Sequence, residues 1–116
     1  MTDPKQKDPT TQNDLIVTIV GRGENTKIVK AARAAGAQGA TIIPGRGTGV
    51  HEQRKLLGIA IEPEKDVVLI VVKREISEQV LQAVVEAGSL DEPATGIAFV
   101  VELSKVVGIT HLLRQR

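Results

Sequence analysis

The chain has 116 residues, a length that forms one domain with a single modest core. Aromatic residues make up 1% of it, cysteine is absent, and 15 basic residues nearly balance 14 acidic ones. These values exclude modules that stack bases on aromatic side chains, disulfides and thiolate metal sites, and they favour neither a nucleic-acid partner nor a membrane surface. The longest apolar run, Val67–Val72, is far too short to cross a bilayer. We expect a soluble, cytoplasmic protein without direct membrane insertion.

The first half of the chain reads as a tail, a strand, a helix and a second strand. Residues 1–13 are polar and are expected to form a disordered tail. The β-branched apolar run Leu15–Val20 predicts a buried strand. Thr26–Ala35 places small apolar and basic side chains at helical spacing, and Gly36 follows in the position typical of a helix end. Ala40–Ile43 predicts the second strand.

The second half repeats this order after a long connection. Gly45–Glu64 is glycine-rich and polar, and it is longer than a compact domain normally has without a function. Val67–Val72 has the strongest strand pattern of the chain. Ser77–Ala87 predicts a helix with Ser77 as its N-cap, and Ile97–Val101 predicts the last strand.

The repeat of strand, helix and strand predicts an α+β fold with the ferredoxin-like βαββαβ order. Both helices then lie on one face of a four-stranded antiparallel sheet. The strands are apolar on both faces, so we expect further copies of the chain to cover the other face. The expected domain spans residues 14–110, a basic tail spans residues 111–116, and the lone aromatic Phe99 is expected in the core.

The stretch Gly45–Gly49, with the sequence Gly-Arg-Gly-Thr-Gly, is the segment with the chemistry of a binding site. Glycines let backbone N–H groups approach an anion closely, and Arg46 adds a positive charge. The stretch lacks the Lys-Ser/Thr ending of a P-loop, and no helix follows it directly as in a dinucleotide-binding fold. A mobile connector is the alternative interpretation.

The two histidines, His51 and His111, are weak candidates for a metal site, because two ligands without cysteine rarely suffice. Solvated histidines are the simpler interpretation. No Ser-His-Asp or paired-carboxylate arrangement has a recognisable catalytic spacing. We therefore expect a protein that is not an enzyme and requires no metal. The alternatives are a metal-binding or metal-responsive oligomer that uses His51 or His111, and a slow nucleotide hydrolase.

Several stretches of the sequence resemble the PII signal-transduction family, and more closely its divergent PII-like branch. The resemblance covers about Leu15 to Ile109 and rests on Gly36–Thr41, Gly45–Gly47, Glu86–Gly88, Pro93–Val100 and Val101–Ile109. It implies a homotrimer of ferredoxin-like subunits that binds adenine nucleotides in the clefts between subunits. It also implies that the long connection, called the T-loop, docks onto a target protein such as a membrane transporter or an enzyme.

The resemblance assigns roles by position in the sequence. The T-loop corresponds to Gly45–Glu64 and the B-loop to Gly88–Gly96. The residues implied to bind the nucleotide are Thr41, Gly45, Arg46, Gly47 and Thr48 on one side of the cleft, and Ala94, Thr95 and Gly96 from the neighbouring subunit. The residues implied to dock the target are His51, Glu52, Arg54 and Lys55.

Some positions depart from the family pattern. Ile97 stands where the family has a lysine, Thr48 where it has an arginine, and Gly108–Thr110 where it has two arginines. The family's modified tyrosine is absent. A triphosphate in a partly buried cleft needs cationic partners. The departures therefore favour ADP or AMP over tight binding of ATP, with bicarbonate as a candidate co-ligand implied by the resemblance.

Overall fold

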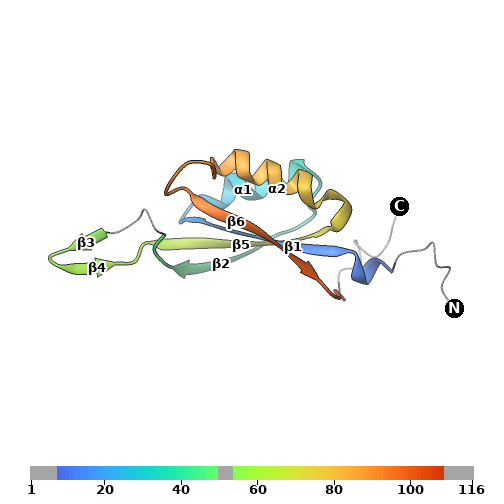
Figure 1. Cartoon of the computed structure of the whole chain (residues 1–116), viewed down its shortest axis with the longest axis horizontal. Coiled ribbons are helices and arrows are strands. Elements are labelled where there is room, and N and C mark those ends of the chain that lie inside the picture. The colour runs from blue at the N-terminus through green and yellow to red at the C-terminus, as the bar shows by residue number, and fades with distance from the viewer. Residues whose placement is uncertain (1–7, 50–53, 109–116) are drawn as a thin grey trace.

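The computed structural model describes residues 8–49 and 54–108 of the chain. Figure 1 shows two helices lying over one face of a sheet, and a thin hairpin that projects from one end of that sheet. The elements in chain order are η1 (Pro9–Thr11), β1 (Asn13–Gly21), α1 (Asn25–Ala34), β2 (Thr41–Arg46), β3 (Arg54–Leu56), β4 (Ile59–Ile61), β5 (Glu64–Lys73), α2 (Arg74–Gly88) and β6 (Gly96–Leu103).

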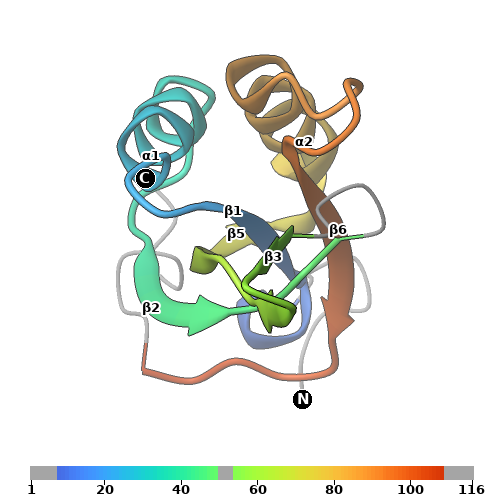
Figure 2. The ribbon, with the colours of Figure 1, turned by 90° about the vertical axis from the view of Figure 1, so that its left-hand side faces the viewer.

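The main sheet has the strand order β2-β5-β1-β6, and every neighbouring pair is antiparallel. This is the ferredoxin-like arrangement that the sequence repeat predicts. Figure 2 looks along the strands and shows α1 and α2 side by side on the same face. Strands β3 and β4 form a separate two-stranded sheet, which is the hairpin of Figure 1.

The core lies between the helices and the sheet. Side chains alternate along a strand, so every second residue of the central strands points toward the helices. The buried residues of this cluster are Ile16 and Val20 of β1, Val68, Ile70 and Val72 of β5, Ile28 and Ala32 of α1, Ala37, and Val80 and Val84 of α2. The core is therefore aliphatic throughout.

The opposite face of the sheet, here called the open face, is also apolar. The strand register places on it Leu15, Val17 and Ile19 of β1, Thr41 and Ile43 of β2, Val67, Leu69 and Val71 of β5, and Ile97, Phe99 and Val101 of β6. Phe99 is 43% exposed there and Val101 is 41% exposed. The expectation that Phe99 lies in the core of the single chain is wrong, because Phe99 pairs with Val17 on the side away from the helices.

The prediction of a disordered tail is wrong over residues 8–13, which are ordered and include η1. Hydrogen bonds, rather than apolar burial, order this segment. The Thr10 backbone N–H donates to the Asp8 carboxylate at 2.9 Å, and the Asn13 side-chain amide donates to the Pro9 carbonyl oxygen at 2.6 Å. The hydrogen bonds from Thr10 lower the pKa of Asp8. Residues 1–7 and 111–116 lie outside the described residues.

Helix α2 begins earlier than the sequence predicts. Its first residue is Arg74, and Ser77, the expected N-cap, is a buried residue inside the helix. The Arg74 backbone N–H donates to the Gln12 carbonyl oxygen at 2.9 Å, so a distant segment satisfies this end of the helix without a side-chain cap.

At the other end of α2, the left-handed residue is Ser89 (φ 51°), which follows Gly88. A side chain at position 88 would require Leu90 and Ile28 to shift. A Cβ there would lie 2.9 Å from the Leu90 Cδ2 atom and 3.1 Å from the Ile28 Cδ1 atom.

Thr18 provides a test of the core. It is fully buried on the helix face of β1, and its hydroxyl oxygen finds no hydrogen-bond partner among the described residues. A buried polar group without a partner costs about 1–3 kcal/mol. We predict that Thr18→Val raises the free energy of unfolding by about 1 kcal/mol in urea denaturation. The exposed Thr26→Val is the control, and a loss of stability in Thr18→Val would contradict the prediction.

Candidate functional site

A pocket of about 290 Å³ lies on the open face, at the end of the sheet from which the hairpin projects. All four strands contribute to it because the register aligns their ends. Val67 pairs with Ile19, and Ile19 pairs with Ile97, so three apolar side chains form a row across the sheet. The lining residues are Ile19, Gly45, Arg46, Gly47, Thr48, Gly49, Lys65, Val67, Gly96 and Ile97.

The pocket has an apolar part and a polar part. Ile19, Val67 and Ile97 make the apolar part, and the glycine-rich stretch Gly45–Gly49, here called the loop base, makes the polar part. Arg46 and Lys65 are the cationic residues among the lining residues. Such a pocket suits a ligand with an anionic group at one end and an apolar body at the other.

A backbone hydrogen bond closes the loop base. The Gly47 N–H donates to the Pro63 carbonyl oxygen at 3.2 Å, and this bond joins the two ends of the connection that carries the hairpin. The long connection expected at residues 45–64 therefore contains the end of β2, the β3–β4 hairpin and the start of β5. A ligand that accepts the Gly47 N–H must compete with the Pro63 carbonyl oxygen.

Gly96 approaches the pocket in a position that only glycine can occupy. Its φ is 144°, and a Cβ there would lie 2.5 Å from the Ile19 carbonyl oxygen and 2.9 Å from the Val20 Cγ1 atom. The preceding loop is held by Thr95, whose hydroxyl lies 2.9 Å from the carbonyl oxygens of Ser89 and Glu92. The backbone of β6 can therefore start directly beside β1.

The predicted nucleotide-binding residues separate into two groups. The pocket brings together Gly45, Arg46, Gly47, Thr48 and Gly96, all from one chain, although Gly96 was expected from a neighbouring subunit. Thr41, Ala94 and Thr95 do not line it. The role of all eight in nucleotide binding stays a prediction. The sequence reasoning missed Ile19, Lys65 and Val67, which strand pairing opposite the loop base would have indicated.

The structure describes two of the four predicted target-docking residues. Arg54 and Lys55 are in β3, whereas His51 and Glu52 lie outside the described residues. His111, the second histidine of the metal alternative, lies outside them as well. Within residues 8–49 and 54–108, no group of three or more His, Asp or Glu side chains could hold a metal ion.

Asp66, a buried carboxylate, fixes the turn between β1 and α1 next to the pocket. It accepts hydrogen bonds from the Asn25 side-chain amide at 2.7 Å and from the Gly23 backbone N–H at 2.9 Å. The bond from Asn25, followed by that from Gly23, lowers the pKa of Asp66. Beside it, Arg22 forms an ion pair with Glu64, which raises the pKa of Arg22. These contacts fix the start of β5, which carries Lys65 and Val67 into the pocket.

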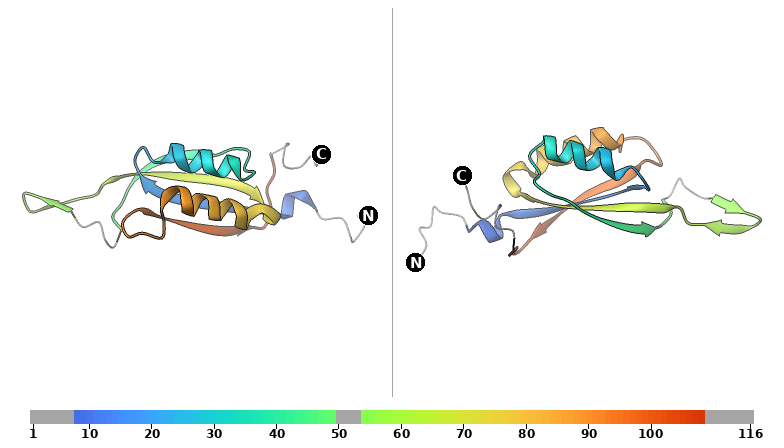
Figure 3. Two further views of the ribbon diagram at one scale, coloured as in Figure 1. Left: turned by 90° about the horizontal axis from the view of Figure 1, so that it is seen from above. Right: turned by 180° about the vertical axis from the view of Figure 1, so that it is seen from behind.

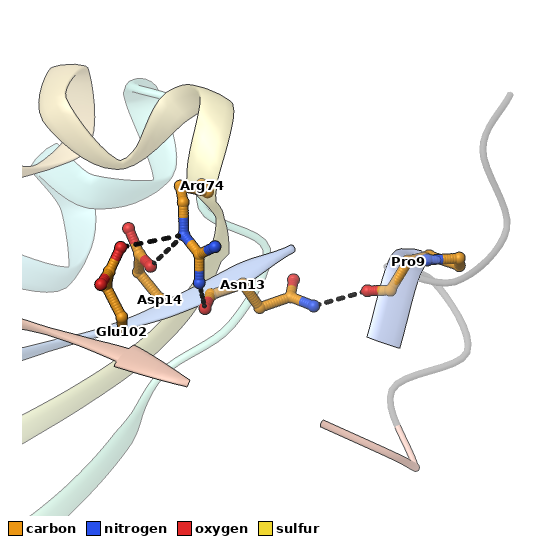
Figure 4. A network of polar contacts seen from close by, with 5 residues as sticks. All are labelled: Pro9, Asn13, Asp14, Arg74 and Glu102. Carbon is orange, nitrogen blue, oxygen red and sulfur yellow. Dashed lines mark hydrogen bonds and ion pairs between the residues drawn. The ribbon is translucent and has the colours of Figure 1, made fainter. Parts of the chain in front are cut away.

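A second polar network lies at the opposite end of the sheet (Figure 4). The Arg74 guanidinium donates from Nε to the Asp14 carboxylate at 2.8 Å and from Nη2 to the Asn13 carbonyl oxygen at 3.0 Å. Glu102 lies 3.9 Å from Nε, and the hydrogen bond to Asp14 is the main cause that raises the pKa of Arg74. This network joins β1, α2 and β6 far from the pocket, so its role is structural.

The sequence comparison decides the family. The model of the family described as nitrogen regulatory protein P-II matches residues 13–111. The chain belongs to the PII family. Members of the PII family are signal-transduction regulators. No curated protein matches the chain in a sequence search.

The solved structures show the same fold. The chain is similar to Arabidopsis thaliana PII bound to citrate, with a TM-score of 0.65 and 22% identity over 90% of this chain and 86% of that chain. In the part of this PII chain that the structure describes, no helix is long and apolar enough to cross a membrane.

The Asp66 contacts predict a pH-dependent effect of mutation. Asp66→Asn removes the charge that the N–H groups of Asn25 and Gly23 stabilise, so the free energy of unfolding should fall by about 1–3 kcal/mol at pH 7. The folded pKa lies below the unfolded value, so this contribution is present above about pH 4 and is lost as the pH falls through the folded pKa.

Urea denaturation at pH 7 and at pH 3 tests this prediction. The difference between wild type and Asp66→Asn should narrow at the lower pH. The exposed Asp91→Asn is the control, and it should change stability little at either pH. A difference that is equally large at both pH values would contradict the role given to the Asp66 carboxylate.

Proposed function

We propose that the chain is a PII-type sensor that binds an adenine nucleotide at the pocket of the loop base and regulates a target protein through the β3–β4 hairpin. The observation that carries this proposal is the juxtaposition of Gly45–Gly49 with Gly96, at the root of the hairpin. Glycine backbone and Arg46 suit the phosphate, and the apolar row of Ile19, Val67 and Ile97 suits the rest of the nucleotide.

The charges of the pocket favour a nucleotide with few phosphates. Arg46 and Lys65 supply two positive charges within one chain, whereas a triphosphate carries several negative charges. ADP and AMP are therefore the proposed ligands, in preference to ATP. Bicarbonate is the proposed co-ligand. Citrate is a further anion to test, because the similar Arabidopsis PII is bound to it.

The Gly47–Pro63 hydrogen bond links the pocket to the hairpin. A phosphate that takes the Gly47 N–H releases the Pro63 carbonyl oxygen and frees the chain that returns from the hairpin. Binding would then shift the hairpin between two arrangements, and the target would bind one of them better. The chain is proposed to act in the cytoplasm on a target that is a membrane transporter or an enzyme, and no catalysis by this chain is required.

Calorimetry with AMP, ADP, ATP and citrate, each with and without bicarbonate, tests the ligand. ADP or AMP should bind more tightly than ATP, and Arg46→Gln should weaken that binding about tenfold through the loss of one charged contact. The control is Arg33→Gln, an exposed arginine on α1 away from the pocket. The absence of binding at millimolar concentration for every nucleotide would exclude the nucleotide part of the proposal.

The open face supports a homotrimer, the assembly typical of the family. Copies that pack these faces together remove Phe99, Val101 and their neighbours from water. Light scattering should give three times the mass of one chain. Val101→Glu should reduce it, because a carboxylate would be buried without a partner. Val107→Glu, which alters an exposed valine outside the sheet, is the control, and a trimer that survives Val101→Glu would contradict this use of the open face.

A further inference from the structure

The tip of the β3–β4 hairpin has an unusual residue in a tight turn. Leu56 pairs with Ile59, so the connection between the strands consists of Leu57 and Gly58 alone. Both have positive φ values, 51° for Leu57 and 80° for Gly58, as in a type I′ hairpin turn. The first position of this turn normally holds Asn, Asp or Gly. A leucine is disfavoured because its Cβ comes close to the following carbonyl oxygen.

Leu57 is also exposed to a degree that the fold does not explain. Its exposed fraction is 93%, the highest among the exposed large apolar residues of the described chain. Ile43, Ile97, Phe99 and Val101 are exposed because they lie on the open face, which the proposed trimer covers. Figure 3 shows that the hairpin extends past the end of the sheet, beyond both helices. A trimer built on the open face therefore gives no reason for the exposure of Leu57.

Leu57 is thus unfavourable in two ways, because its backbone has a positive φ and its apolar side chain is 93% exposed. Unfavourable local choices of this kind concentrate where a protein meets something else. We infer that Leu57 is the apolar anchor with which the hairpin enters a leucine-sized apolar pocket of the regulated protein. This inference rests on the proposed function, and it names the residue and the partner surface through which that function acts.

The charges beside the hairpin tip indicate what should surround the apolar pocket of the partner. Arg54 and Lys55 precede the tip by two or three positions, so an acidic rim around an apolar centre would complement them. A second copy of this chain is a poor occupant at the loop-base pocket, because Arg46 and Lys65 line it. The inferred occupant is a different protein with an apolar pocket bordered by Asp or Glu, and docking against the alanine-lined surface beside Glu86 of a second copy is the alternative that the crosslinks decide.

A photo-crosslinking amino acid in place of Leu57 identifies the partner surface. The variant Leu57→p-benzoylphenylalanine is expressed in the source cells, and crosslinked peptides are sequenced by mass spectrometry. The expected result is a set of peptides from one other protein, which surround an apolar pocket with acidic neighbours. Crosslinks only to further copies of this chain, or spread over many unrelated proteins, would overturn the inference.

The purified partner then provides the quantitative test. Leu57→Asn creates the Asn-Gly pair that type I′ turns prefer, so it keeps the turn and removes the apolar side chain. We expect its affinity for the partner to fall about 10- to 100-fold, the range set by burial of one leucine. Val107→Asn is the matched control. It removes another exposed apolar side chain (72% exposed) far from the hairpin, and it should bind as wild type does.

The outcomes separate this inference from the function on which it rests. Equal affinity of Leu57→Asn and wild type for the partner overturns the role of Leu57 and leaves the nucleotide sensor standing. Weakened binding by Leu57→Asn, with the same partner affinity in the presence and absence of ADP, supports the anchor and contradicts regulation by the nucleotide. Nucleotide affinity itself should be the same in wild type and Leu57→Asn, because Leu57 does not line the pocket.

Discussion

The antiparallel pairing of β1 with β5 decides which face every residue of the two central strands occupies. It places Val68 opposite Thr18 toward the helices, and Val67 opposite Ile19 on the open face. A slip of one residue would exchange the two faces and expose the core. Asp66 helps to prevent such a slip, because its buried carboxylate ties the start of β5 to the turn that follows β1. The same register aligns the residues that form the pocket, so the core and the candidate site depend on one set of strand pairs.

Much of the fold could be predicted from local pattern. The β-branched runs indicated the central strands, and Gly36 marked the end of α1, where φ is 117° and the Ala37 N–H donates to the Ala32 carbonyl oxygen. The start of α2 could not be predicted in this way. Its first backbone N–H is satisfied by Gln12, which is distant in sequence, and no local signal encodes that contact.

The site was predictable only in part, for a related reason. The glycine-rich sequence predicts the loop base, and the family resemblance indicates the B-loop around Gly96. The apolar half of the pocket does not, because Ile19 and Val67 belong to it through register alone. The sequence predicts only a long connection where the hairpin lies, and its turn is Leu-Gly rather than the Asn-Gly that signals a type I′ hairpin. Leu57, the first residue of this turn, is also the residue that the structure singles out by its positive φ and its exposure.

Among the exposed apolar residues of the described chain, those of the open face and Leu57 call for different partners. The open face is broad and continuous across the strands, and a face of that shape is suited to burial against copies of itself. Leu57 is a single side chain on a narrow hairpin outside that face, and one protruding residue fits a pocket rather than a plane. The loop base lies between the two, at the pocket end of the open face and at the root of the hairpin. A ligand there would contact the open face and the loop base that leads into the hairpin, and from that position the proposed binding would change what the hairpin presents to a partner.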